Sequence, residues 1–336
     1  MVHVVITGGG GFVGARLARR LLAAGELDLA GDGPRAIERL TLIDQAGVPD
    51  DLAGDGRVTA VPGDLGDLLA AGPGPLAGAG LIFHLAAAVS GECEADFDLG
   101  MRANLRATEA LLAAGRALGT APVLVYSSSI AAFGDSPDHP LPAILDDETL
   151  PNPQSSYGTQ KVIGEYLLAD HTRKGFLRGR TMRLATISVR PGRPNAAASG
   201  YLSSIIREPL AGQRAVCPVD AATAAALASP DRAIAALLCA ATATDEAWGG
   251  HSAVNMPSLT VTVAEMVAAL ERAAGPAASA LIDWVPDPAV ERLVASWPTR
   301  FRTDRAARLG LTPDPDYDAV IAMHLAETRA PGRQSP

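Results

Sequence analysis

The chain opens with Met1-Val-His-Val-Val-Ile-Thr7 and continues at once into Gly8-Gly-Gly-Gly-Phe-Val-Gly14. The first run is short, apolar and rich in β-branched residues, which predicts a strand buried on both faces, as in a parallel sheet. Residues 15–22 then show the apolar spacing of an amphipathic helix. The sequence therefore predicts a strand, a glycine turn and a helix in direct succession.

A glycine turn between a buried strand and a helix is typical of a dinucleotide-binding site. Glycines let the backbone approach a pyrophosphate, and the helix N-terminus offers unpaired N–H groups and a favourable dipole. A flexible surface loop is the alternative, but the place of the turn between two regular elements disfavours it. The residues that we expect at the cofactor here are Gly8, Gly11, Phe12, Val13 and Gly14.

The second predicted strand, residues 40–44, ends in an acid, Asp44. A carboxylate at this place binds the adenosine ribose and repels a 2′-phosphate, so Asp44 favours NAD over NADP. A plain turn residue is the alternative. Asp44 lies 30 residues beyond Gly14, whereas the usual offset is about 20. The Gly, Asp and Pro content of residues 25–39 suggests a loop insertion that takes up the extra length.

Further strands alternate with helices along the chain. Residues 57–65, 81–87, 122–127 and 180–184 are predicted strands, and residues 96–118 are a predicted helix. This alternation predicts an α/β protein with a doubly wound parallel Rossmann sheet, whose binding site lies at the carboxyl ends of its strands. At these ends we expect two residues at the adenine and two beside the cofactor, namely Asp64 and Leu65, and Leu85 and Ala86.

Tyr157 and Lys161 lie four residues apart in a predicted helix. Residues at i and i+4 share one face of a helix. A tyrosine has a pKa near 10, so its use as a base near neutral pH requires a shift of about 3 units, which a fixed neighbouring cation favours. Such pairs also occur on solvated helices, so their surroundings decide. Ser129 follows the strand 122–127 and precedes this helix at the distance of a βα unit, so its hydroxyl can face the phenol.

These motifs, in this order, resemble the extended short-chain dehydrogenase/reductase family, which includes NAD-dependent epimerases and dehydratases. The resemblance covers nearly the whole chain. It implies that Ser129 holds the substrate hydroxyl, that Tyr157 is the acid/base, and that Lys161 lowers the pKa of Tyr157 and binds the nicotinamide ribose. It also implies NAD as cofactor, a proton relay supported by Asn104, and a homodimer in which the helices of Asn104 and Tyr157 pair with their symmetry mates.

Four longer stretches resemble the D-erythronate dehydrogenases of that family, namely residues 87–101, 186–199, 206–210 and 294–298. This resemblance implies NAD-dependent oxidation of the C2 hydroxyl of a four-carbon sugar acid. Because a guanidinium binds a carboxylate best, we expect Arg190 and Arg207 at the carboxylate. Ser90 and Thr186 are expected at substrate hydroxyls, with turn capping as the alternative. Residues 220–228 depart from the group, in which basic and aromatic residues precede the Ser229-Pro230 pair. The alanine run that stands here cannot hydrogen-bond a polyol.

Other functions share the same catalytic residues. An NDP-sugar epimerase would keep NAD tightly bound and return the hydride to the substrate. A catalytically silent NAD-binding sensor is disfavoured by the intact Tyr157 and Lys161. A sugar-nucleotide 4,6-dehydratase is disfavoured because Ile130 and Ala131 occupy the places of the Asp-Glu pair of that group.

The composition restricts the partners. The chain has 28 basic and 37 acidic residues and a formal net charge of −9, so we expect no attraction to a nucleic-acid backbone. No basic amphipathic segment suggests a membrane surface. Cys93, Cys217 and Cys239 are scattered without metal-ligand spacing, which predicts free thiols in a reducing compartment and no metal site. Because the first strand begins at residue 2, we expect no signal peptide and a cytoplasmic location.

The length is sufficient for two lobes. We expect residues 1–185, rejoined by residues 229–257, to form the NAD-binding domain. Residues 186–228 and 258–329 are expected to form a smaller mixed α/β substrate-binding lobe over the active site. The tail, residues 330–336, is expected to be disordered.

Overall fold

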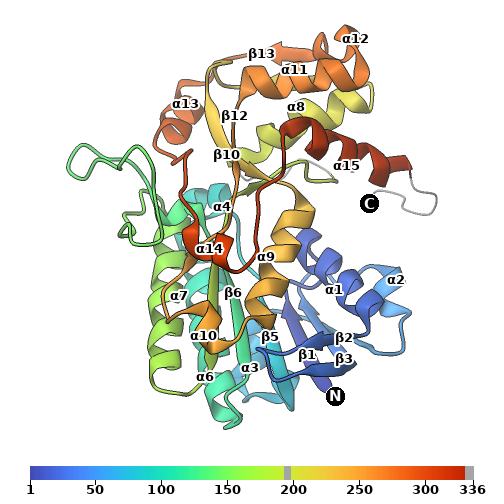
Figure 1. Cartoon of the computed structure of the whole chain (residues 1–336), viewed down its shortest axis with the longest axis vertical. Coiled ribbons are helices and arrows are strands. Elements are labelled where there is room, and N and C mark those ends of the chain that lie inside the picture. The colour runs from blue at the N-terminus through green and yellow to red at the C-terminus, as the bar shows by residue number, and fades with distance from the viewer. Residues whose placement is uncertain (193–197, 330–336) are drawn as a thin grey trace.

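A computed structural model describes residues 1–192 and 198–329 of the chain. The strands of its main sheet are β1 (Val2–Thr7), β2 (Glu26–Asp28), β3 (Pro34–Asp44), β4 (Val58–Pro62), β5 (Ala79–His84), β6 (Val123–Ser129), β7 (Arg178–Leu184) and β11 (Val254–Asn255). Their order is β11-β7-β6-β5-β1-β3-β2, and β4 also pairs with β3 (Figure 1). Only β2 runs antiparallel to its neighbour among these described strands. The predicted parallel sheet is confirmed.

Helices cover both faces of this sheet, because successive strand residues point to opposite sides. Val4 packs in one core cluster with Leu17 and Leu237, whereas Val5 packs in another with Leu111. The first face is covered by α1 (Phe12–Ala24) and α9 (Pro230–Thr242), and the second by α3 (Leu65–Ala70), α6 (Ala107–Ala117) and α7 (Ser156–Arg173). Burial on both faces explains why four of the six residues of β1 are apolar. The doubly wound Rossmann architecture is confirmed.

A smaller lobe lies over the carboxyl ends of the main sheet (Figure 1). Its strands pair as β12-β10-β8 and β13-β9, with the bounds β8 (Thr186–Ile187), β9 (Ala215–Cys217), β10 (Ala224–Ala228), β12 (Leu259–Thr262) and β13 (Ile282–Trp284). Its helices are α8 (Tyr201–Leu210), α11 (Val263–Ala274), α12 (Pro276–Ser279), α13 (Pro288–Ala295) and α15 (Tyr317–Arg329). Side chains of α8, α11 and α15 share one apolar core with β9 and β10.

Short elements connect these layers. They are α2 (Asp50–Ala53), α4 (Ser90–Ala95), α5 (Phe97–Gly100), α10 (Asp245–Trp248) and α14 (Asp304–Arg308), with 3-10 turns at Gly74–Leu76, Ile130–Ala132 and Ala198–Gly200. The segment predicted as a helix, residues 96–118, is helical from Phe97 to Ala117 but not a regular α-helix throughout. A π-helical turn, η2 (Met101–Arg106), separates α5 from α6, and Asn104 lies in it. Such turns occur frequently at functional sites.

The alanine-rich segment lies inside the smaller lobe and not at a binding surface. Residues 224–228 form β10, which pairs with β12 and β8. Its last four residues, 225–228, are at most 5% exposed. None of residues 220–228 lines the cavity described below. The alanine side chains of this strand therefore pack within the smaller lobe and bring no hydrogen-bonding group to the cavity.

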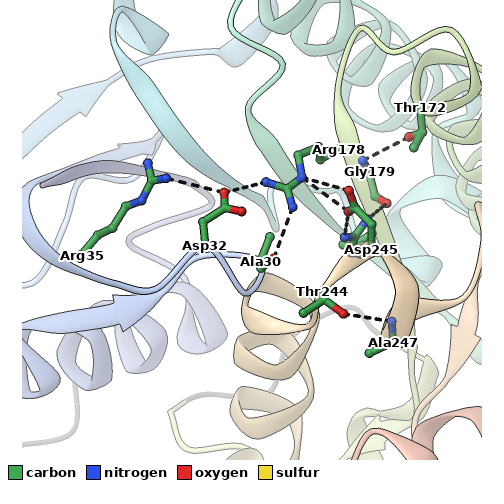
Figure 2. A network of polar contacts seen from close by, with 10 residues as sticks. Ala30, Asp32, Arg35, Thr172, Arg178, Gly179, Thr244, Asp245 and Ala247 are labelled. Carbon is green, nitrogen blue, oxygen red and sulfur yellow. Dashed lines mark hydrogen bonds and ion pairs between the residues drawn. The ribbon is translucent and has the colours of Figure 1, made fainter.

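The loop insertion predicted at residues 25–39 is wrong, because this segment forms a β-hairpin of β2 and the first part of β3. Figure 2 shows the polar contacts that stabilise this hairpin. Arg178 donates from Nη1 to Asp32 at 2.9 Å and from Nη2 to the carbonyl oxygen of Ala30 at 3.2 Å. The same guanidinium pairs with Asp245 of α10 at 3.3 Å. The partners that fix the hairpin lie more than a hundred residues away in the sequence, where local composition does not reveal them.

The chain crosses between the two lobes more than once. Within residues 229–257, α9 packs on the main sheet and β11 extends it beside β7. Part of the range 258–329 also lies on that side. Ala306 of α14 belongs to the core of the main sheet, and Arg305 donates to the carbonyl oxygen of Trp248 at 3.0 Å. The expected domain boundaries stay a prediction. Within the range 258–329, α14 packs on the main sheet and not in the smaller lobe.

The predicted disordered tail, residues 330–336, lies outside the described residues. Within residues 1–192 and 198–329, no helix has the length and apolar character needed to cross a membrane.

Candidate active site

A cavity of about 840 Å³ opens at the carboxyl ends of the main sheet, below the smaller lobe. This is the place where doubly wound α/β proteins bind their ligands. It is lined by most of the residues that the sequence indicated, namely Gly8, Gly11, Phe12, Val13, Gly14, Asp44, Asp64, Leu65, Leu85, Ala86, Ser90, Ser129, Tyr157, Lys161, Thr186 and Arg190. Two indicated residues, Asn104 and Arg207, do not line it.

The glycine turn leaves no room for side chains. A Cβ on Gly14 would lie 2.0 Å from the carbonyl oxygen of Gly8, and a Cβ on Gly8 would lie 2.8 Å from the amide nitrogen of Ala86. Gly8 also has a φ of 71°, in the left-handed region that favours glycine. The helix α1 begins after Gly11, and no side chain caps its first N–H groups. These donors are therefore available to the pyrophosphate of a dinucleotide.

The acid at the end of β3 is held by the same turn. Asp44 Oδ2 accepts from the backbone N–H of Gly10 at 3.0 Å and of Gly11 at 3.2 Å. A carboxylate fixed beside the turn would repel the 2′-phosphate of NADP. Gln45, which no sequence motif indicated, also lines the cavity and donates to Asp64 Oδ2 at 2.8 Å. Both ends of the expected adenosine site therefore carry a carboxylate.

The helix α7 presents a phenol and an ammonium to the cavity together. Lys161 Nζ lies 5.6 Å from the ring centroid of Tyr157 and donates to the carbonyl oxygen of Ser127 at 2.9 Å. Gly158 lets the helix approach the end of β6, since a Cβ there would lie 2.1 Å from the carbonyl oxygen of Ala131. The four-residue spacing thus places both side chains at the cavity, and Gly158 lets their helix lie close to the end of β6.

Burial dominates the ionisation of both side chains. Burial, with a smaller contribution from Cys93, raises the pKa of Tyr157 to about 12, although a hydrogen bond with Ser129 and the charge of Arg190 act in the opposite direction. Burial lowers the pKa of Lys161 to about 8. For the protein alone, burial thus outweighs the groups that favour the phenolate, which are Ser129 and Arg190. The expected effect of Lys161 on the pKa of Tyr157 stays a prediction. A positive charge beside the ring favours the phenolate.

Asn104 lies behind the cavity wall and is 2% exposed. Its Oδ1 accepts from the backbone N–H of Ala88 at 2.8 Å, and its Nδ2 donates to Gln160 Oε1 at 2.8 Å. Its carbonyl oxygen accepts from Thr108 at 2.5 Å. Among the described residues no hydrogen bond joins Asn104 directly to Lys161, and the relay through water that the resemblance implies stays a prediction.

The two arginines expected at a substrate carboxylate differ in placement. Arg190 lines the cavity and donates from Nη2 to Ser199 at 2.9 Å. Arg207 points elsewhere, because its Nη1 donates to the carbonyl oxygen of Arg190 at 2.6 Å and its Nη2 pairs with Glu208 at 2.5 Å. The structure thus corrects the expectation that Arg207 contacts the substrate. Arg207 instead holds the backbone of Arg190, the arginine that lines the cavity.

Several residues line the substrate end of the cavity without any motif that indicated them, namely Glu92, Glu94, Ser199, Leu293, Trp297 and Pro298. Glu94 accepts from the backbone N–H of Ser156 at 2.7 Å and so ties α4 to the first turn of α7. Trp297 and Pro298 belong to the stretch 294–298, whose likeness to related sequences was the signal available for them. Glu92 and Glu94 lie in the stretch 87–101 and Ser199 at the end of the stretch 186–199, whereas Leu293 lies just outside these stretches, in α13.

Comparison with known proteins places this geometry in a family. Residues 4–247 match the NAD dependent epimerase/dehydratase family. The D-erythronate dehydrogenase of Cupriavidus necator is 48% identical over 97% of this chain and 98% of its own length. The D-erythronate dehydrogenase of Haemophilus influenzae is 38% identical over 96% of this chain and 99% of its own length.

Solved structures agree with this assignment. The structure of the nucleoside-diphosphate-sugar epimerase from Agrobacterium tumefaciens is 40% identical, covers 97% of this chain and 94% of that chain, and has a TM-score of 0.85. The L-threonine 3-dehydrogenase of Trypanosoma brucei, at 23% identity and a TM-score of 0.80, shares the fold. The chain therefore belongs to the NAD dependent epimerase/dehydratase family and is an enzyme that uses a nicotinamide cofactor.

Proposed function

We propose that this chain is an NAD-dependent sugar-acid dehydrogenase that oxidises the C2 hydroxyl of a D-erythronate-like four-carbon acid to the 2-oxo acid. Two relatives that it matches over almost their whole length are named D-erythronate dehydrogenase. The observation that carries the proposal is a guanidinium, that of Arg190, which lines the same cavity as the phenol of Tyr157.

Arg190 has no anionic partner among the described residues. Burial and the charge of Arg207 lower the pKa of Arg190, and no carboxylate of the described residues forms a salt bridge with it. Its guanidinium carries five N–H donors, and the bond to Ser199 uses one of them. Buried charges are normally paired. A substrate carboxylate can supply the pair through two parallel hydrogen bonds.

The catalytic residues then act on the neighbouring hydroxyl. Ser129 hydrogen-bonds the C2 hydroxyl, Tyr157 takes its proton as general base, and the C2 hydrogen leaves as hydride, which gives the 2-oxo acid. NAD, when bound, supplies the hydride acceptor and a positively charged ring. Lys161, held by the carbonyl oxygen of Ser127, stabilises the phenolate electrostatically.

NAD is the cofactor that the residues fit. The glycine turn leaves a backbone cradle that a Cβ would fill, and the first N–H groups of α1 carry no side-chain cap. Asp44, held by two backbone N–H groups of the turn, disfavours a 2′-phosphate. The cytoplasmic location and the homodimer expected from the sequence stay predictions.

A nucleoside-diphosphate-sugar epimerase is the second candidate, because the 40% identical structure from Agrobacterium tumefaciens has that description. It would use the same Ser129, Tyr157 and Lys161. The two functions differ in net chemistry, since an epimerase returns the hydride and accumulates no NADH.

The proposal is tested by mixing the purified protein and NAD with a panel of four-carbon sugar acids and following NADH formation. The corresponding sugar alcohol, which lacks the carboxylate, is the matched control and should not react. Arg190→Met should raise KM for the acids, and Tyr157→Phe should abolish turnover while leaving NAD binding largely intact. NAD that copurifies with the protein, together with interconversion of UDP-sugars and no NADH from any acid, would establish the epimerase instead.

A further inference from the structure

The helix α15 joins the two lobes, although its core contacts belong to the smaller one. Tyr317, Val320 and Ile321 in its first turns pack with α8 and α11 in the apolar core of the smaller lobe. Its other end lies beside α1, the helix that begins at the glycine turn (Figure 1). None of its described residues lines the cavity. An effect of α15 on the site must therefore act through the residues that it holds.

Glu327 ties the last turns of α15 to the cofactor helix. It forms an ion pair with Arg16 of α1, and the two side chains are 26% and 16% exposed, so water screens the pair only in part. Arg16 also donates from Nε and Nη2 to Asp231 at 3.1 and 2.6 Å. The Asp231 side chain is 58% exposed and lies on α9, which packs on the main sheet together with α1. Of these two carboxylates, Glu327 is the one that connects α1 to the smaller lobe.

Tyr317 ties the first turn of α15 to the segment of Arg190. Its hydroxyl lies 2.8 Å from Ser188 Oγ, and both residues are buried. Ser188 donates its single hydroxyl proton to the carbonyl oxygen of Leu202 at 3.0 Å. Tyr317 must therefore be the donor to Ser188, which lies two residues before Arg190. A change in the position of α15 thus reaches the segment that carries the substrate arginine.

The backbone of Arg190 is held by the same lobe on its other side. Its N–H donates to Ser203 Oγ at 3.1 Å, and its carbonyl oxygen accepts from Arg207 at 2.6 Å, both residues of α8. Burial lowers the pKa of His324 on α15, and the charges of Glu327 and Arg207 act on it in opposite directions, so α15 also lies close to Arg207. The helices α8 and α15 therefore hold Arg190 as parts of one packed unit, which Glu327 fixes against α1.

These two ties lie at opposite ends of one helix. At a rise of 1.5 Å per residue, α15 spans about 15 Å between Tyr317 and Glu327. We infer that α15 is a strut, and that Glu327 and Tyr317 are positioning residues that set the distance from Arg190 to the cofactor helix. The inference rests on the proposed function, in which NAD is held at α1 and the acid at Arg190. The hydride then passes only where this distance brings C2 of the acid to the nicotinamide.

Glu327→Gln tests the first tie, because it removes the charge and keeps the shape of the side chain. Misplacement of reacting groups by about 1 Å can lower a rate on the order of 10²-fold, and the core of the smaller lobe limits the shift, so we expect kcat for the sugar acid to fall roughly tenfold. KM for the acid and the Kd of NAD should change little, since Arg190 and the glycine turn keep their own contacts. Asp231→Asn is the matched control. It removes the other carboxylate from Arg16 within the main lobe and should leave kcat unchanged.

Tyr317→Phe tests the second tie and leaves the first in place. It removes the donor to Ser188 and should lower kcat by a similar factor. A strut that is released at either end no longer sets the distance, so the double variant with Glu327→Gln should be no slower than the slower single variant. Two unrelated structural defects would instead multiply their effects on kcat.

Hydrogen exchange separates this inference from the proposed function, because it needs no substrate. In Glu327→Gln, exchange of residues 186–190 should become faster, although no hydrogen bond or ion pair of the described residues joins Glu327 to any of them. Asp231→Asn should leave this exchange unchanged. The inference is overturned by multiplied effects in the double variant, by a wild-type kcat in Glu327→Gln, or by wild-type exchange of residues 186–190 in that variant. If the wild type oxidised no sugar acid, the proposed function would fail, and this exchange would still decide the role of α15.

Discussion

Replacing Glu165 by glutamine should destabilise the protein by about 3–5 kcal/mol, because it leaves a buried guanidinium without its counter-charge. Glu165 of α7 accepts from Arg183 Nε at 2.9 Å and from Nη2 at 2.7 Å. The two side chains are 6% and 5% exposed, so water cannot screen the pair. Ser128 adds a third, short hydrogen bond. The expected loss is large against the roughly 5–15 kcal/mol of a typical domain.

Equilibrium unfolding in urea, at an unchanged m-value, measures this loss. Asp170→Asn on the same helix is the matched control, because it breaks the pair with Arg173, whose side chains are 59% and 65% exposed, and should cost less than about 1 kcal/mol. A double variant with methionine at Glu165 and Arg183 should recover most of the stability, since both charges are removed together. An equal cost of Glu165→Gln and Asp170→Asn would refute the reasoning that burial governs the strength of the pair.

The same variant should also change the pH dependence of turnover. Burial lowers the pKa of Lys161 to about 8, while the charges of Cys93 and Glu165 act in the opposite direction. Removing the carboxylate of Glu165 therefore lowers the pKa of Lys161 further. Because the ammonium is then lost at a lower pH, the alkaline limb of kcat should move to lower pH in Glu165→Gln. A limb that moves upward contradicts this account.

Three other substitutions test the ribose carboxylate, a buried histidine and the hairpin. Asp44→Ala should move the kcat/KM ratio from NAD toward NADP, because it removes the carboxylate beside the ribose site. His84→Gln should flatten the acid side of the stability curve, because burial and the charge of Lys161 lower the pKa of His84 to about 3. The unfolded chain takes up a proton below its pKa of about 6.5 that the folded chain excludes, so the wild type should lose stability on the order of 3 kcal/mol between neutral pH and about pH 4.5. Urea unfolding at the two pH values checks this. Arg178→Ala should speed hydrogen exchange of residues 26–36 far more than it lowers global stability, since its partly exposed ion pairs contribute about 1 kcal/mol, and equally faster exchange throughout the sheet would speak against it.

The sequence predicts the catalytic half of the cavity well because that half is local. Gly8 and Gly14 meet within one turn, and Tyr157 and Lys161 meet within one turn of a helix. Such contacts depend on backbone geometry that a few residues determine. Ser129 is reached through a single βα connection. Each of these positions follows from spacing alone, so the motif order was sufficient to bring them into one cavity.

The substrate half depends on contacts that spacing does not encode. Arg190 and Arg207 are the same residue type in neighbouring segments, and only the position of Glu208 and of the Arg190 carbonyl distinguishes their roles. Asn104 was expected at a proton relay by its place in the order of motifs. The π-helical turn that directs its amide toward Ala88 has no sequence signature, since it arises where α5 and α6 pack on α7.

Arg190 also separates the two candidate functions. Ser129, Tyr157 and Lys161 can take a proton and a hydride from many secondary alcohols, so the substrate is determined by what holds the rest of the molecule. A sugar acid carries its charge one carbon from the reacting hydroxyl, whereas a nucleoside diphosphate sugar carries its phosphates across a sugar ring. Arg190 and Tyr157 are close enough to shift the pKa of one another. Because Coulomb energy falls with distance, a carboxylate paired with Arg190 in the cavity of Tyr157 fits the proposed short acid better than phosphates that lie a sugar ring away.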